Sequence, residues 1–341
     1  MISLAHAAAA KALDWPVVAV ASRTPERAAS VAGIAEARAV SYAQLPAGAD
    51  IVVVATPPQC HADDAIRALE AGAAVVLEKP LCRTLAEADR LVAAAAQHGG
   101  RLLYAENLAY APIVQRLIAM VPRIGTLTHL EVRTLQGLPT WGDFTSDEWG
   151  GGALFDLGVH PLAVALLIAN AAGHGRPVAV RATLRGGTGH GSDEHAEVTL
   201  RYRSGFHARV VASWQAGPEQ LWDVQVAGEA GVLRAELMPS YSLEFNGEEV
   251  AMPSAQGDLA ALVRLGYLEQ LRAFGQDLNS GREPMMSATF GREVLQVVMA
   301  AYASAAITGR PSDSAAKSSG EVALPFAGQR DLTPLELWRR H

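Results

Sequence analysis

The feature that most constrains the fold is an alternation in the first third of the chain, where short apolar runs are separated by alanine-rich amphipathic stretches. The apolar runs have the length of buried strands and cover 17–21, 51–55, 74–77 and 101–105. The stretches between them have helical spacing and cover 25–32, 61–71 and 85–98. Strands that alternate with helices form a parallel sheet with helical crossovers. The sequence therefore predicts a doubly wound α/β domain.

The chain starts with a helix, which we expect over 3–13, before the run at 17–21. Sheets of this kind usually open with a strand and a G-x-G-x-x-G turn, whose backbone amides bind a pyrophosphate. Two later glycine-rich runs, at 150–152 and 186–191, lack that spacing. The hypothesis from the sequence is that strand one and its glycine turn lie before Met1 and that the natural start lies upstream.

Beyond residue 110 the pattern changes to long strand-like segments with turn signals between them. Strands are expected at 127–135, 178–184, 196–202, 206–214 and 222–226, and helices at 113–120, 153–168 and 290–308. Consecutive strands joined by turns such as 203–205 predict an antiparallel sheet. Gly309-Arg310-Pro311 is a helix-stop signal, and 311–320 reads as a surface loop. We therefore expect a dinucleotide-binding domain over 1–108 and an α+β domain over 109–341.

Composition excludes several classes of protein. The 341 residues carry 28 Lys plus Arg against 35 Asp plus Glu, a formal net charge of -7, so no basic field is available for nucleic acid. No apolar run reaches the roughly 18 residues of a membrane helix. The two cysteines, Cys60 and Cys82, form no C-x-x-C motif and are too few for a disulfide framework. We expect a cytoplasmic protein.

Ser22 and Arg23 follow the strand predicted at 17–21. An Asp or Glu at this position would bind the ribose 2'-hydroxyl of NAD, whereas a hydroxyl and a guanidinium suit the 2'-phosphate of NADP. The sequence favours NADP over NAD as the cofactor. The alternative is that Arg23 is an ordinary surface arginine.

Thr56-Pro57 and Glu78-Lys79-Pro80 each follow a predicted strand, and ligands of open α/β sheets bind beyond the carboxyl ends of strands. The chain has only three lysines, Lys11, Lys79 and Lys317. A desolvated lysine can share a proton near neutral pH, which makes Lys79 a candidate for catalysis. A structural ion pair between Lys79 and Glu78 is the alternative.

Asp156 and His160 follow the glycines at 150–152. If residues from 153 onward form one helix, side chains four apart share a face and can contact one substrate. An imidazole can accept a hydroxyl proton, and a carboxylate can orient the ring. A simple surface pair is the alternative. His190 and His195 lack partners at ligand spacing, so we expect a turn between strands there and no metal site.

Taken together, these motifs resemble one family. The residues that carry the resemblance are Thr56-Pro57, His61, Glu78-Lys79-Pro80, Glu106-Asn107, the glycine-rich lead-in to Asp156 and His160, and Gly291-Arg292-Glu293. Over nearly its whole length the chain is similar to the glucose-fructose oxidoreductase, inositol dehydrogenase and MocA family. The resemblance implies a Rossmann-like domain and a second domain with a large, open, mostly antiparallel sheet that serves in oligomer contacts.

The resemblance also implies roles for single residues. Lys79, Asp156 and His160 would form the catalytic group, and Pro80 would be cis. The nicotinamide side would be lined by Thr56, Pro57, His61, Glu78 and Asn107, and the adenosine side by Ser22 and Arg23.

The function expected from these observations is reversible hydride transfer between NAD(P) and a secondary alcohol or carbonyl carbon of a sugar, cyclitol or related small molecule. The expected assembly is a homodimer or homotetramer. Two alternatives stay open: a catalytically silent regulator that binds the cofactor or a sugar, and a reductase of non-sugar carbonyls. Trp141, Trp149 and Trp214 are candidates for stacking on a sugar ring, with core packing the more common role for Trp214.

Overall fold

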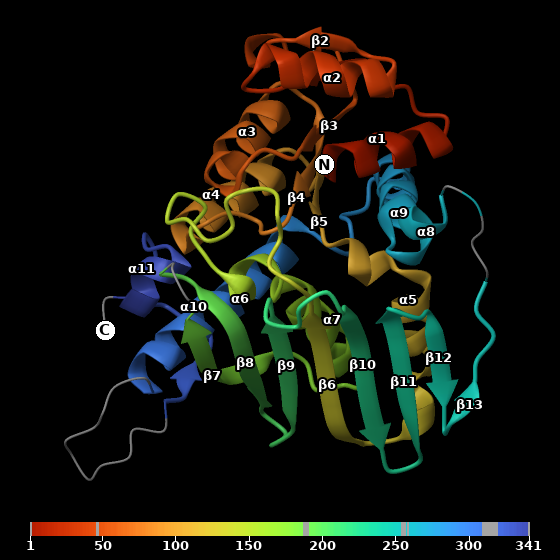
Figure 1. Cartoon of the computed structure of the whole chain (residues 1–341), viewed down its shortest axis with the longest axis vertical. Helices are drawn as coiled ribbons and strands as arrows, with labels where there is room; N and C mark the ends of the chain where they lie inside the picture. Colours follow the sequence, from red (N-terminus) through yellow and green to blue (C-terminus); the bar gives the residue numbers. More distant parts are fainter. Residues whose placement is uncertain are drawn as a thin grey trace. The chain divides into compact units, whose positions relative to one another are not determined.

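The computed structural model describes residues 2–45, 48–186, 191–253, 257, 259–308 and 320–339. The chain forms two compact units, each built from three stretches (Figure 1). The first unit consists of Met1–Leu81, Ala88–Ala111 and Ser254–Gly291. The second consists of Cys82–Glu87, Pro112–Pro253 and Arg292–His341. The domain boundary at residue 108 stays a prediction.

The first unit alternates strands and helices. Its strands are β1 (Ala19–Ala21), β2 (Arg38–Val40), β3 (Ile51–Val54), β4 (Ala74–Glu78) and β5 (Leu102–Ala105). Its helices are α1 (Ile2–Ala12), α2 (Pro25–Ala35), α3 (Pro58–Glu70), most of α4 (Leu85–Gln97), α8 (Ala260–Arg264) and α9 (Tyr267–Ser280), with the 3-10 turns η1 (Tyr42–Gln44) and η2 (Asn107–Tyr110). Strand β2 was not expected from the sequence, because it is three residues long and mostly exposed.

All strand pairs of this unit are parallel, which confirms the predicted Rossmann-like α/β class. The strands form two sheets, β1-β2 and β3-β4-β5. Every residue of β4 and β5 is buried, as expected for strands covered on both faces.

Strands β1 and β3 each have a free edge, and their unit carries exposed apolar side chains. Within the described ranges, β1 pairs with β2 alone and β3 with β4 alone, so each has one edge without a strand partner. Val18 next to β1 is 41% exposed, Val53 in β3 is 38% exposed, and Ile34 in α2 is 63% exposed. Backbone groups at these edges can still accept a hydrogen-bonding partner.

The second unit is built on a nine-stranded sheet. The strand order is β13-β12-β11-β10-β6-β9-β8-β7-β14, and all pairs are antiparallel except β6 with β9. The strands are β6 (Leu127–Leu135), β7 (Pro177–Gly186), β8 (Asp193–Tyr202), β9 (His207–Ser213), β10 (Leu221–Gly228), β11 (Gly231–Met238), β12 (Ser242–Phe245), β13 (Glu248–Glu249) and β14 (Val322–Ala323). The helices are α5 (Pro112–Met120), α6 (Ala153–Asp156), α7 (Val159–Ala171), α10 (Ala288–Thr308) and α11 (Pro334–Arg339), with the 3-10 turn η3 (Val121–Ile124). The predicted large, mostly antiparallel sheet is confirmed.

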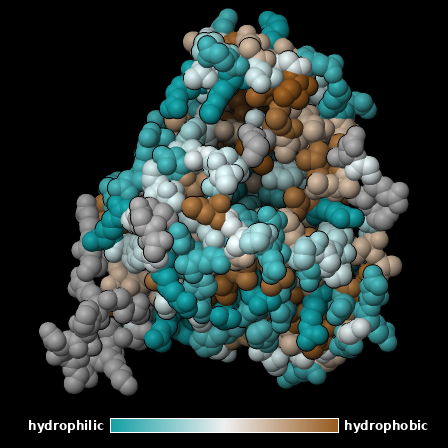
Figure 2. Space-filling view, in the orientation of Figure 1, coloured by the Kyte–Doolittle hydropathy of each residue, from teal (hydrophilic) through white to brown (hydrophobic). Residues whose placement is uncertain are grey.

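The two faces of this sheet differ in chemistry. Helix α7 packs on β6 and β9, and α5 packs on β11 and β12, over a buried row that includes Leu130 and Val132. The other face carries charged side chains paired across strands: Arg133 binds Asp223 in a bidentate pair with distances of 2.8 and 2.5 Å. In Figure 2, hydrophilic residues cover much of the lower part of the view, where Figure 1 shows the strands of this sheet.

Two sequence expectations need comment here. His195 lies in β8, which starts at Asp193, so the strand begins earlier than predicted and His195 belongs to the strand. His190, with the other residues of 187–190, and the helix stop and loop over 309–319 lie outside the described residues. Among the helices of the described ranges, none combines the length and the apolar character that crossing a bilayer requires.

Candidate functional site

The first group of predicted site residues lies at the carboxyl ends of β3 and β4 in the first unit. Thr56 follows β3, and its hydroxyl donates to Asp64 of α3 at 3.0 Å. Pro57 is the N-terminal capping residue of α3. Lys79 follows β4 and is partly exposed, and the Lys79–Pro80 peptide bond is cis, as the family resemblance implies. The two strand ends therefore place Thr56, Pro57 and Lys79 on one unit.

His61 connects these two strand ends. Its side chain is 1% exposed, with Nδ1 2.8 Å from the carbonyl oxygen of Pro80 and Nε2 2.7 Å from that of Thr56. Burial is the largest influence and lowers the pKa of His61, whereas the two carbonyls and the Glu78 carboxylate act to raise it. Both ring nitrogens are thus used within the unit, and a place for His61 beside a nicotinamide stays a prediction.

Glu78 forms a buried pair with His6, a residue that sequence reasoning missed. His6 is 2% and Glu78 is 5% exposed, and His6 Nε2 lies 2.6 Å from Glu78 Oε1. The second carboxylate oxygen accepts from the backbone N–H of Lys79 at 3.1 Å. Burial acts to raise the pKa of Glu78, but His6 and Lys79 together hold it below its usual range. The available signal was that His6 and Ala9, three residues apart on α1, share the buried face.

The remaining predicted cofactor residues also lie in the first unit. Ser22 is half-buried and Arg23 is exposed, just after β1, and the backbone of Arg23 bonds to the Tyr42 hydroxyl. Asn107 is buried, and its amide donates to the carbonyl of Leu265 at 2.7 Å. Asn107 therefore connects η2 to the segment that leads into α9, and its contact with a nicotinamide stays a prediction.

Asp156 and His160 lie in the second unit, on two short elements instead of one helix. The predicted helix over 153–168 is broken: α6 ends at Asp156 and α7 begins at Val159. At the break the N–H of Gly158 bonds to the carbonyl of Ala153, and the N–H of His160 bonds to that of Leu157. The first of these hydrogen bonds reaches further back along the chain than the bond of a regular α-helix, and the second reaches less far. The spacing of residues in the sequence could not show this irregularity.

A buried carboxylate holds the start of α6. Asp193 is fully buried, and its Oδ2 accepts from the N–H of Leu154 at 2.8 Å. Its Oδ1 accepts from the Tyr302 hydroxyl at 2.5 Å, and that hydroxyl accepts in turn from the N–H of Gly152. Burial and Asp193 raise the pKa of Tyr302 well above its usual range. Asp193 was not a sequence candidate, because nothing in the local pattern separates it from the acidic residue that follows.

An aromatic ring packs beside His160. The Trp222 ring lies 5.7 Å from the imidazole, centre to centre, at an angle of 33°. Trp214 is buried with Leu157 in a cluster that Trp222 also contacts, so its expected core role is confirmed. Trp222 was not a sequence candidate. The indole N–H groups of Trp214 and Trp222 have no hydrogen-bond partner among the described residues.

The two other tryptophans considered from the sequence form a separate aromatic group. Trp141 is 43% exposed, and Phe144 makes edge-to-face contacts with both Trp141 and Trp149, with ring centres 4.8 and 4.9 Å apart. Stacking of Trp141 or Trp149 on a sugar stays a prediction.

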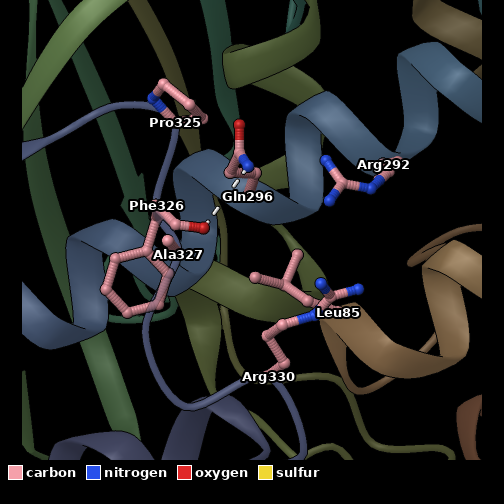
Figure 3. A pocket seen from close by; sticks show the side chains of 7 residues that line it. All are labelled: Leu85, Arg292, Gln296, Pro325, Phe326, Ala327 and Arg330. Atoms are coloured by element: carbon pink, nitrogen blue, oxygen red, sulfur yellow. Dashed lines mark hydrogen bonds between the residues drawn. The ribbon is translucent and has the colours of Figure 1, made fainter.

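A cavity of about 160 Å³ lies elsewhere in the second unit (Figure 3). Its lining consists of Leu85, Arg292, Gln296, Pro325, Phe326, Ala327 and Arg330. Inside it the Gln296 amide donates to the carbonyl of Phe326 at 3.5 Å, and both arginines have interactions of their own. None of the predicted catalytic or cofactor residues lines this cavity. In the part of the chain that the structure describes, no cluster of three or more His, Cys, Asp or Glu could hold a metal ion.

The donor set at the strand ends fits a dinucleotide cofactor. An exposed guanidinium and a hydroxyl after β1, from Arg23 and Ser22, can donate hydrogen bonds to the adenosine side of such a cofactor. A hydroxyl after β3 and an ammonium after β4, from Thr56 and Lys79, are partly exposed where open α/β sheets bind their ligands.

Comparisons with known proteins agree with this geometry. The profile described as "Oxidoreductase family, NAD-binding Rossmann fold" matches residues 1–106, and the "GFO/IDH/MocA C-terminal domain" profile matches residues 114–234. The chain belongs to the GFO/IDH/MocA family. This is a family of NAD(P)-dependent sugar oxidoreductases.

Three relatives illustrate the similarity. A putative UDP-kanosamine synthase oxidoreductase subunit of Amycolatopsis mediterranei is 37% identical over 47% of this chain and 46% of its own. D-glucoside 3-dehydrogenase of Escherichia coli is 35% identical over 35% of each chain. The crystal structure of GenD2 from gentamicin A biosynthesis, in complex with NAD, has a TM-score of 0.81 at 25% identity and covers 95% of this chain and 93% of its own. The chain thus spans about half or less of the first two GFO/IDH/MocA relatives.

Proposed function

We propose that this member of the GFO/IDH/MocA family is an oxidoreductase that transfers a hydride between NAD(P) and a secondary alcohol or carbonyl carbon of a sugar, cyclitol or related small molecule. The observation that carries the proposal is the way the fold holds Lys79. The turn after β4 is anchored by Glu78, which is bonded to His6 and to the N–H of Lys79, while the Lys79 side chain stays partly exposed.

Lys79, Asp156 and His160 act together in this proposal. His160 accepts the hydroxyl proton of the alcohol through a ring nitrogen, and Asp156 orients the imidazole. The ammonium of Lys79 polarises the reacting oxygen and stabilises the negative charge that develops on it. When bound, the cofactor accepts or supplies the hydride at its nicotinamide ring.

Asp156 and His160, the two residues of this group that lie in the second unit, are on elements held in place by packing. The start of α6 is fixed through Asp193 and Tyr302, and the Trp222 ring packs against His160. Side chains that carry out a proton transfer need such a fixed geometry, because misplacement by about 1 Å costs about a hundredfold in rate.

Ser22 and Arg23 support a preference for NADP. Arg23 is exposed just after β1, where its guanidinium would donate to a 2'-phosphate, and the half-buried Ser22 hydroxyl supplies a second donor next to it. Cytoplasmic location and a homodimer or homotetramer complete the proposal.

The proposal is tested by His160→Ala. A panel of aldoses, glucosides and inositols is screened for NADP⁺ reduction with the unaltered chain, and the variant is compared on the best substrate. Turnover is expected to fall about a hundredfold or more, with little change in cofactor affinity, because a general base contributes this much to the rate. His129→Ala, at an exposed position of β6, is the matched control and should keep full turnover. Unchanged turnover in His160→Ala would show that His160 is not the residue that accepts the hydroxyl proton.

A further inference from the structure

The two hydrogen-bond contacts of His61 are unusual for a buried histidine. Nδ1 and Nε2 lie 2.8 and 2.7 Å from the carbonyl oxygens of Pro80 and Thr56, and the ring is 1% exposed. A carbonyl oxygen only accepts, so each contact requires an N–H on the ring. A neutral imidazole has one N–H, and its other nitrogen would turn a lone pair toward an oxygen. Both contacts are hydrogen bonds only if the ring is an imidazolium.

The charges around His61 agree with this protonation state. Glu78, the carboxylate that faces His61 from β4, has a lowered pKa and is therefore ionised at neutral pH. A buried carboxylate requires a nearby positive charge or several donors. Lys79 beside the carboxylate supplies part of that charge. The Glu78 carboxylate in turn favours the protonated form of His61.

His6 is a second histidine beside Glu78. Its Nε2 contacts Glu78, while its Nδ1 is buried without a hydrogen-bond partner among the described residues. His6 therefore also faces the carboxylate, and together with Lys79 it holds the pKa of Glu78 below its usual range.

The remaining charged groups near His61 on α3 have partners at the surface. Asp64 accepts from Thr56 and pairs with Arg67, and Asp63 pairs with Arg90. Burial is the largest influence on His61 and lowers its pKa below the ordinary value, whereas the two carbonyls and Glu78 act to raise it. We base the protonation state on the number of N–H donors that the two contacts require. At these distances a neutral ring would make only one hydrogen bond, and the lone pair of its other nitrogen would repel the lone pairs of the second carbonyl oxygen.

We propose that His61 is a positioning residue that acts as an imidazolium, joining the carbonyl of Thr56 after β3 to that of Pro80 after β4 and so fixing the turn that presents Lys79. The role in catalysis rests on the proposed function. Loss of the proton removes one of the two bonds, separates the strand ends and loosens the Lys79 turn.

Protonation can be measured without a substrate. The full chain is labelled with ¹⁵N-histidine, and ring N–H signals are followed by NMR from about pH 5 to pH 8, the range in which histidines ordinarily titrate. The expected result is one imidazole with two N–H groups protected from exchange at neutral pH, absent in His61→Gln. A spectrum in which every protected imidazole has one N–H overturns the proposal, even if His61→Gln does not fold.

The positioning role is measured with His61→Gln. A glutamine side chain donates only through its amide nitrogen, so it can form a hydrogen bond with one of the two carbonyls. The other carbonyl then loses its donor, because an amide oxygen cannot donate. We expect kcat to fall about tenfold or more while the KM for NADPH changes less than about twofold, because the turn moves but the cofactor contacts remain. His129→Gln is the control. Full kcat in His61→Gln overturns the role. A doubly protonated His61 in a chain without oxidoreductase activity would instead contradict the proposed function alone.

Discussion

At the scale of single residues, buried histidines organise the candidate site, and their roles depend on which ring nitrogens carry protons. His6 donates to Glu78, and the carboxylate accepts from the N–H of Lys79 in turn. The folded state lowers the pKa of Glu78, so this pair stabilises the protein above the ordinary carboxyl range near pH 4.5. The stabilisation is lost as the pH falls through the pKa of the folded state.

His6→Ala should destabilise the protein by about 3 kcal/mol at neutral pH, because it removes the donor of a buried carboxylate. Urea denaturation at pH 7 measures the loss, and the difference from the unaltered chain should shrink below about pH 4.5 as Glu78 is protonated. Lys11→Ala, on the same helix in an exposed pair with Glu36, is the control and should change little. Equal stability of His6→Ala and the unaltered chain at pH 7 would show that the pair is not formed.

Sequence patterns could single out Lys79 and Glu78 because both follow an apolar run that is plainly a strand. They could not single out His6 or Asp193, since the partner of each is about 40 to 70 residues away in the chain. Contacts at that separation depend on how elements pack, which local periodicity does not encode. The same reason explains why Trp222 was missed although its strand was expected.

At the scale of elements, most strands and helices followed from periodicity, and the exceptions have local causes. The strand at Leu127–Leu135 was predicted with its observed bounds, because alternating burial gives a clear signal over nine residues. The break between α6 and α7 was missed because Leu157 and Gly158 keep near-helical backbone angles. Tertiary anchoring by Asp193, instead of a sequence signal, sets where α6 begins.

Gly152→Ala should therefore disturb the site. A Cβ at Gly152 would lie 2.3 Å from Oδ1 and 2.4 Å from the backbone oxygen of Asp193, so α6 must shift. We expect a loss of about 2 kcal/mol in thermal denaturation, together with reduced turnover as Asp156 and His160 move. Gly33→Ala in α2 is the control, because a Cβ at this position would meet nothing within 4 Å. The higher helix propensity of alanine should stabilise that variant by about 0.5–1 kcal/mol. A Gly152→Ala protein as stable and active as the parent would contradict the anchoring by Asp193.

At the scale of the whole molecule, the chain combines a parallel Rossmann-like unit with a unit built on a nine-stranded sheet, as the family assignment requires. The sheet face opposite α5 and α7 carries ion pairs such as Arg209 with Glu131 and Glu197, so its described side chains there include charged groups paired across strands. The homodimer or homotetramer expected from the family therefore stays a prediction, and burial of an apolar sheet face gives it no support.

The central claim is that this chain is a nicotinamide-dependent oxidoreductase, and cofactor binding tests it most directly. NADPH and NADH are titrated into the protein and the change in their fluorescence is followed. The account predicts saturable binding of both, tighter for NADPH, and a rise of about tenfold in the NADPH Kd for Arg23→Ala with no change for NADH, since a charge-assisted hydrogen bond to a phosphate is lost. Absence of saturable binding by either nucleotide would contradict the account.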